Sequence, residues 1–376
     1  MDLKSHLKEQ PASERADFEQ LVKTLKSWPE ATVSGDFTDR VMDAVARESL
    51  AEKRFSPARS LKGYARPIAI AAGLLILAAG SLPFLRRDCP RQGEINPIDW
   101  LASVQGQDGL WDPAKYGGYA SYCPALTSLS ALALDKDPQN RYGEEIRRAC
   151  LALGNLQNSH SGAFGTAERA GHYNHAMTTY ALARLEPRCP EIKPVLEKAI
   201  SFISESQSAA GGWDYVPDSD GNTAITIWNL RALAQADALG IRQAKIPLCK
   251  GLRWLRNAVM ADGGIVCSKR GPENRSECLT ALTAYAFLEA TPNFPELGKL
   301  ARMLLDRLPA DVPLLDLRDS YRDYAKTIAF TAAGADRKAA ISRGYLRNHP
   351  VEDLHKDMWG SVGGHLYTRA LAALVQ

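Results

Sequence analysis

Residues 100–111 read Trp-Leu-Ala-Ser-Val-Gln-Gly-Gln-Asp-Gly-Leu-Trp, and the glycine-aromatic turn that ends this stretch decides the fold. Related turns recur about every fifty residues through the last three-quarters of the chain. They lie at residues 107–111, 162–165, 211–214, 262–265 and 357–360. The last interval is about twice as long as the others, as if one copy had eroded near residues 311–313. A fixed period of this length indicates a repeat architecture.

Each turn lies between two helical patterns. Before the first turn, Asn96 and Pro97 supply an N-cap and a first helical residue, and Ile98, Leu101 and Val104 follow at helical spacing. After it comes a second pattern that is rich in Ala and Ser. The same pair recurs to the end of the chain, which predicts six helical hairpins. The second helices, with small side chains, suit an inner ring, and the first helices suit an outer one.

The repeat is similar to that of a known family. Residues 100–111, and residues 202–207 with the turn that follows them, resemble the repeat of terpenoid cyclases and protein prenyltransferases. The resemblance covers residues 96–376 and implies an all-α fold, an (α/α)6 toroid whose central cavity is lined by the inner helices. In such a repeat glycine permits the tight turn and the aromatic ring fills the gap between hairpins. That role is structural and requires no catalysis.

One acidic segment matches the place of a cyclase active site. Squalene-hopene cyclases protonate an alkene with an aspartate of an Asp-x-Asp-Asp motif at the start of an inner helix. Residues 218–222 read Asp-Ser-Asp-Gly-Asn at the corresponding place, so the resemblance implies Asp218 and Asp220 as a proton-donor region. However, Gly221 and Asn222 replace the second half of the acidic pair, and the segment also suits a surface turn and helix cap. We expect the turn, and the catalytic role is the alternative.

A zinc site of the prenyltransferase type has weaker support. Those enzymes bind zinc through Asp, Cys and His to activate a thiolate. Cys278 and His365 lie at roughly similar inner-helix starts, but the Asp-x-Cys spacing is missing and the nearest acid is Glu277. We therefore expect no metal site and no cofactor.

Aromatic and histidine side chains gather near the turns and the inner-helix starts. Rings over a concave surface suit an apolar, isoprenoid-like ligand or a glycan, although such rings also pack helices together. The candidate residues of a ligand cavity are Trp111, Tyr119, Tyr122, His172, Tyr173, His175, Tyr215, Trp228 and His365.

Residues 67–85 predict a single transmembrane helix. They form an uncharged stretch with charged margins, and about nineteen residues span roughly 28 Å as a helix. Five basic residues precede the stretch within residues 53–66 and three follow it, which favours a cytoplasmic N-terminus. Residues 96–376 would then be extracytoplasmic. All seven cysteines lie beyond residue 88, which agrees with disulfides there and leaves one cysteine over.

The N-terminal segment, residues 1–52, predicts two short amphipathic helices, and residues 53–66 form a basic juxtamembrane linker. Residues 28–42 resemble the cytosolic segment of membrane-bound anti-sigma factors, which implies a cytosolic protein partner. The zinc-binding variety of that family carries a His-Cys-Cys cluster, and no cysteine precedes Cys89 here. A partly disordered tail is the alternative.

Composition narrows the function further. The chain has 376 residues, 45% hydrophobic and 24% charged, and a net charge of +3, which is too small to indicate nucleic-acid binding. We predict a single-pass membrane protein with a non-catalytic toroid that binds a ligand or partner, with signalling as a further role. The alternatives are a squalene cyclase-like enzyme acting on an isoprenoid and a structural scaffold.

Overall fold

The computed structural model describes residues 96–165, 169–215, 221–260, 263–265, 276–309, 319–347 and 354–376. These residues contain twelve α-helices, several short 3-10 helices and no strand, so the described part is all-α, as predicted. They lie within one compact unit, residues 91–376. The predicted N-terminal helices, basic linker and membrane span, residues 1–85, lie outside the described residues. Within the described residues, no helix combines the length and apolarity that crossing a bilayer requires.

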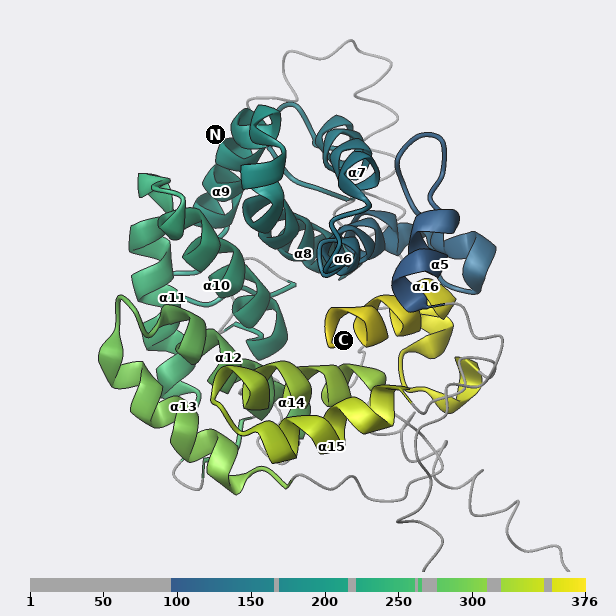
Figure 1. The fold of residues 1–376 in the computed structure, drawn as a ribbon. Helices are drawn as coiled ribbons and strands as arrows, with labels where there is room; N and C mark the ends of the chain where they lie inside the picture. The colour runs from purple at the N-terminus through teal and green to yellow at the C-terminus, as the bar shows by residue number, and fades with distance from the viewer. Residues whose placement is uncertain are drawn as a thin grey trace, which may run out of the picture. The chain divides into compact units, whose positions relative to one another are not determined.

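Two sets of helices alternate along the chain (Figure 1). The inner set is α6 (Cys123–Leu134), α8 (Arg169–Leu185), α10 (Thr223–Ala238), α12 (Glu277–Ala290), α14 (Ser320–Ala332) and α16 (Gly360–Leu374). The outer set is α5 (Pro97–Ser103), α7 (Gly143–Asn155), α9 (Lys193–Glu205), α11 (Lys245–Asn257), α13 (Pro295–Arg307) and α15 (Asp336–Arg347). Each inner helix contacts the next inner helix along the chain, and α16 contacts both α6 and α5.

Side-chain size separates the two sets. In α6 every residue from Pro124 to Leu134 is buried, and small side chains allow the neighbouring helices to approach closely. One polar pair crosses the contact between α6 and α8: the hydroxyl oxygens of Ser128 and Thr178 are hydrogen-bonded at 3.0 Å. The outer helices instead bury a single face, as α11 does with Leu248, Leu252 and Leu255.

The turns require glycine for two reasons. Gly109, Gly162 and Gly211 have φ angles of 86°, 77° and 100°, in the left-handed region that L side chains rarely adopt. In addition, a Cβ at these positions would lie 2.6, 2.7 and 2.8 Å from a backbone oxygen of the next outer helix. The turn of one hairpin therefore lies directly against the outer helix of the next hairpin.

A glutamine four or five residues before each of these glycines strengthens the same contact. Gln207 Nε2 donates to the carbonyl of Gly211 and to that of Pro247 in α11, both at 2.9 Å. Gln105 and Gln157 make the matching pairs of bonds to their own turns and to α7 and α9. Each glutamine thus joins two consecutive hairpins.

The aromatic residues of the first and third turns pack inside the structure against the preceding outer helices. Trp111 and Trp213 are buried, and each indole N–H donates to a carbonyl of the preceding outer helix at 2.8 Å. Their predicted structural role is confirmed. Trp359 differs, since 46% of it is exposed, so the last turn has no such ring inside the structure.

We expect Gly211→Ala to lower the free energy of unfolding by about 3 kcal/mol, because left-handed backbone and overpacking both add cost. Gly240→Ala is the matched control. Its φ is 79° but nothing lies within 4 Å of the added Cβ, so it should cost only about 1 kcal/mol. Urea denaturation of both variants measures the difference. Equal losses would show that the close carbonyl is unimportant.

Candidate functional site

His175 was a candidate cavity residue, and the structure places it behind a turn. It is buried, and its Nδ1 accepts the backbone N–H of Phe164 at 3.2 Å. Nε2 lies 3.2 Å from the Ala199 carbonyl, so Nε2 carries the proton. At the first and third turns the hydroxyls of Thr127 and Thr226 accept the equivalent backbone N–H groups. Burial lowers the pKa of His175 to about 3.

Three other candidates come together at the start of α8. Tyr215 Oη donates to Tyr173 Oη at 3.2 Å, and the His172 ring meets the Tyr215 ring edge-on with centroids 5.6 Å apart. Burial lowers the pKa of His172. Asp218 and Asp220 lie outside the described residues.

Tyr119, Tyr122 and His365 are less deeply placed. The Tyr119 backbone N–H donates to the Val362 carbonyl at 2.8 Å, which holds its loop beside the start of α16. The Tyr119 side chain is 57% exposed. Tyr122 and His365 are half-buried. The structure therefore brings Tyr119 near the helix turn that carries His365.

A cationic cluster that the sequence analysis missed lies between the inner helices. Arg231 of α10 is 2% exposed. Its Nε donates to Glu289 of α12 at 3.0 Å, and its Nη2 donates to Tyr180 of α8 at 2.8 Å. Its guanidinium carbon lies 4.2, 4.5 and 4.8 Å from the ring centroids of Tyr180, Trp228 and Tyr285. We call these five residues the Arg231 cluster.

Residues of the cluster itself stabilise the charge of the buried Arg231 guanidinium. The Glu289 carboxylate and three ring faces stabilise the buried cation. In the part of the chain that the structure describes, Nη1 has no hydrogen-bond partner. Burial raises the pKa of Tyr180 well above its ordinary value, so its hydroxyl stays neutral. Trp228 extends the cluster to α14, because its indole N–H donates to Tyr321 Oη at 2.6 Å.

A second group of polar residues lies at the starts of α12 and α14 and just after the break at Gly364 in α16. Cys278, Asp319 and Tyr367 are electrostatic neighbours there, and Cys278 and Tyr367 are buried. Among the described residues, no group hydrogen-bonds to the buried Tyr367 hydroxyl. Burial raises the pKa of Cys278, of Asp319 and of Tyr367, and nearby carboxylates add to the rise. We call these three residues the helix-start group.

Cys278 is therefore a neutral thiol rather than a thiolate at pH 7. His365, its predicted companion in a zinc site, lies on α16. Among the described residues, no three His, Cys, Asp or Glu side chains are grouped closely enough to hold a metal ion.

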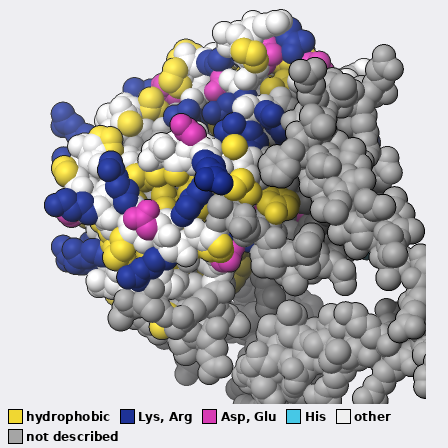
Figure 2. Space-filling view, turned by 60° about the horizontal axis from the view of Figure 1, so that its bottom comes forward, with side chains coloured by type: hydrophobic (Ala, Val, Ile, Leu, Met, Phe, Trp, Pro, Cys, Tyr) yellow, Lys and Arg dark blue, Asp and Glu magenta, His cyan; other side chains and the backbone are white. Residues whose placement is uncertain are grey.

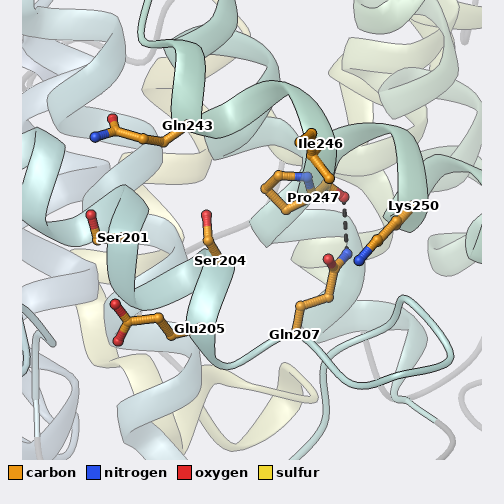
Figure 3. A pocket seen from close by; sticks show the side chains of 8 residues that line it. All are labelled: Ser201, Ser204, Glu205, Gln207, Gln243, Ile246, Pro247 and Lys250. Carbon is orange, nitrogen blue, oxygen red and sulfur yellow. Dashed lines mark hydrogen bonds between the residues drawn. The ribbon is translucent and has the colours of Figure 1, made fainter.

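The outer surface carries an open pocket between α9 and α11, with a volume of about 310 Å³ (Figure 3). Six of its eight lining residues have polar side chains, and one of them, Gln207, already bonds to the Pro247 carbonyl. The lining residues are Ser201, Ser204, Glu205, Gln207, Gln243, Ile246, Pro247 and Lys250. This pocket contains none of the predicted cavity residues.

The outer helices also differ in charge along the chain. The exposed ion pairs of the described residues involve the first half of the unit, for example Arg147 with Glu191. In contrast α11 contains four basic residues and no acid. Figure 2 shows many Lys and Arg side chains and few Asp and Glu on the face that includes the lower side of Figure 1.

Comparison with known proteins adds no assignment, since no family model matches the chain and no curated protein matches its sequence. The site must be argued from its residues alone. One signal for the Arg231 cluster was present in the sequence: Arg231 follows Trp228 by three positions within a helix of small and apolar residues. Its partners on two other helices, α8 and α12, carried no such signal.

We expect His175 to make stability depend on pH. Its pKa is about 3 when folded and about 6.5 when unfolded, so the unfolded chain binds the extra proton. Stability is therefore lost as pH falls from 6.5 towards 3, with a slope approaching about 1.4 kcal/mol per pH unit.

His175→Thr should reduce this slope, because threonine does not titrate in this pH range. Threonine is chosen because its hydroxyl accepts the equivalent backbone N–H at the first and third turns. Urea denaturation at several pH values measures both slopes. The comparison of slopes matters, since the smaller side chain lowers stability at every pH. Parallel curves for the two proteins would mean that His175 is not held neutral.

Removing one partner of the Arg231 cluster should be worse than removing both. Glu289→Leu leaves a buried cation unpaired and should cost about 3 kcal/mol, whereas Arg231→Met with Glu289→Leu should recover at least half of that. Arg147→Ala, which breaks an exposed pair, should cost less than about 1 kcal/mol. Thermal denaturation compares the variants, and a double variant no better than Glu289→Leu would contradict the ion-pair account.

Proposed function

We propose that residues 96–376 form an (α/α)6 toroid that binds a small ligand with an apolar, isoprenoid-like body and a polar head, without transforming it. The alternation of inner and outer helices, and the contact of α16 with α6, support this architecture. Aromatic side chains on several inner helices support an apolar ligand.

The observation that carries the proposal is the unpartnered hydroxyl of Tyr367. It belongs to a side chain that is 9% exposed, and a buried polar group without a partner costs free energy. The carboxyl of Asp319, with its raised pKa, lies nearby as a second polar group. A ligand head that hydrogen-bonds to Tyr367 would remove this cost.

The chemistry of the helix-start group favours binding over turnover. A nucleophilic cysteine acts as a thiolate, and Cys278 is held neutral. Tyr367 is also held neutral, so neither group offers a base. The alternative, a squalene cyclase-like enzyme, depends on Asp218 and Asp220.

The proposal includes a position at a membrane. Residues 67–85 would anchor the chain with its N-terminus in the cytoplasm, and residues 1–52 would engage a cytosolic protein there. Binding of the ligand outside could then be signalled across the membrane. The basic outer face of α11 is complementary to anionic lipid headgroups and is consistent with a location close to the bilayer.

Tyr367→Phe tests the ligand proposal. Loss of an unpartnered hydroxyl should leave the unfolding temperature of the ligand-free protein unchanged or slightly higher, whereas ligand affinity should fall about tenfold. Mass spectrometry of apolar compounds that copurify with the full chain measures retention. Tyr142→Phe is the control, because its hydroxyl binds Asp99 between outer elements and should not affect retention.

Five results would contradict parts of this proposal. Absence of any copurifying apolar compound, or equal retention by both variants, would remove the ligand. Turnover of a polyprenyl or triterpene substrate that Asp220→Asn abolishes would establish the enzyme instead. A reporter fusion that places the C-terminus in the cytoplasm would overturn the topology, and failure of residues 1–52 to retain a cytosolic protein would remove that partner.

A further inference from the structure

Two buried cysteines lie against each other where α7 meets the connection between α8 and α9. Cys150 is on α7, and Cys189 lies between the short 3-10 helices η4 (Glu186–Arg188) and η5 (Pro190–Ile192). Both side chains are 0% exposed. Each thiol is an electrostatic neighbour of the other, so the two side chains lie close together.

Charged contacts hold the α8–α9 connection to α7 and to the loop between α6 and α7. Arg147 Nε lies 2.8 Å from Glu191 Oε1, and Arg147 precedes Cys150 by one helical turn on the same face of α7. Arg188, next to Cys189, pairs with Asp135 at 2.6 Å and donates to Asn140 at 2.7 Å. The approach of the thiols is therefore part of a fixed local structure.

The other described thiols lack this arrangement. Cys123 bonds to the Trp111 carbonyl and lies near Thr127, and the electrostatic neighbours of Cys278 are Asp319, Arg322 and Asp323. Neither has a cysteine beside it. Cys150 and Cys189 are thus the pair that the described residues single out.

We propose that Cys150 and Cys189 form a disulfide that links α7 to the α8–α9 connection when the chain folds in the presence of a disulfide oxidant. The oxidant is a small-molecule disulfide or the disulfide of a thiol oxidoreductase. This proposal is independent of the ligand proposed above.

The exchange balances in two steps. One cysteine thiolate attacks a sulfur of the oxidant, forms a mixed disulfide and releases the first oxidant thiolate. The second cysteine thiolate then attacks its partner's sulfur, forms the Cys150–Cys189 bond and releases the second oxidant thiolate. Two protons leave the cysteines and can be taken up by the two released thiolates, so the oxidant is reduced to two thiols.

The exchange takes place before burial is complete. In the folded chain burial raises the pKa of Cys189 to about 11 and that of Cys150 further, which leaves almost no thiolate at neutral pH. A thiol in the unfolded chain has an ordinary pKa of about 8.5 and reacts far faster. Once formed, a bond between two fully buried cysteines is also shielded from reductants.

Synthesis of the full chain in vitro, with detergent and a mixture of reduced and oxidised glutathione, tests the bond directly. After alkylation of free thiols and non-reducing trypsin digestion, the expected product joins residues 149–169 to residues 189–198. In the folded protein before digestion, the disulfide should resist dithiothreitol until denaturant is added. Recovery of both cysteines as alkylated thiols, or linked to other cysteines, would overturn the proposal.

A stability measurement makes a second test. The melting temperature should be higher by about 5–10 °C after synthesis with oxidised glutathione than after synthesis with dithiothreitol. Cys150→Ala and Cys189→Ala should each abolish this difference, and the double variant should abolish no more. Cys249→Ala is the matched control and should retain the difference. A difference that survives in either Cys150→Ala or Cys189→Ala would contradict the pairing.

Discussion

The close approach of an outer-helix carbonyl to the preceding glycine turn is the constraint on which the described structure depends. At Gly211 the Lys250 carbonyl lies where a side chain would otherwise begin, and Gln207 bonds to both sides of the same contact. Only a glycine, a glutamine and backbone groups are needed. This contact fixes one hairpin on the next and requires no particular side chain on the inner helices. The inward-facing residues of those helices can therefore vary.

This division explains which features could be predicted from the sequence. Helical periodicity and a turn glycine describe local geometry, so the hairpins, the Asn96 cap and the role of Trp213 followed from short stretches of chain. The turn at residues 357–360 was predicted to resemble the others, but its Trp359 ring is exposed. In this turn the glycine follows the aromatic residue instead of preceding it. Trp359 has no left-handed glycine before it to direct its ring inward, and it is exposed.

The Arg231 cluster and the role of His175 depend on tertiary contacts, which no local sequence pattern indicates. Arg231 finds its partners Tyr180 and Glu289 on α8 and α12, more than fifty residues away in each direction. His175 shows the opposite problem. A histidine near an inner-helix start suggested a ligand, whereas the structure has it accepting the backbone N–H that a threonine accepts elsewhere. The residue type suggested a ligand-binding role, but the imidazole Nδ1 already accepts a hydrogen bond from the Phe164 backbone N–H in the turn.

The Arg231 cluster also limits where a ligand of the proposed kind could lie. A buried ion pair is a poor source of stability compared with apolar packing, and its value lies in fixing which side chains meet. Here it fixes α8, α10 and α12 against one another and occupies the ring faces of Tyr180, Trp228 and Tyr285. Tyr367 lies outside this cluster, and among the described residues no group hydrogen-bonds to its hydroxyl. A ligand would therefore bind towards the inner-helix starts, with Arg231 limiting how far its apolar body could extend between the helices.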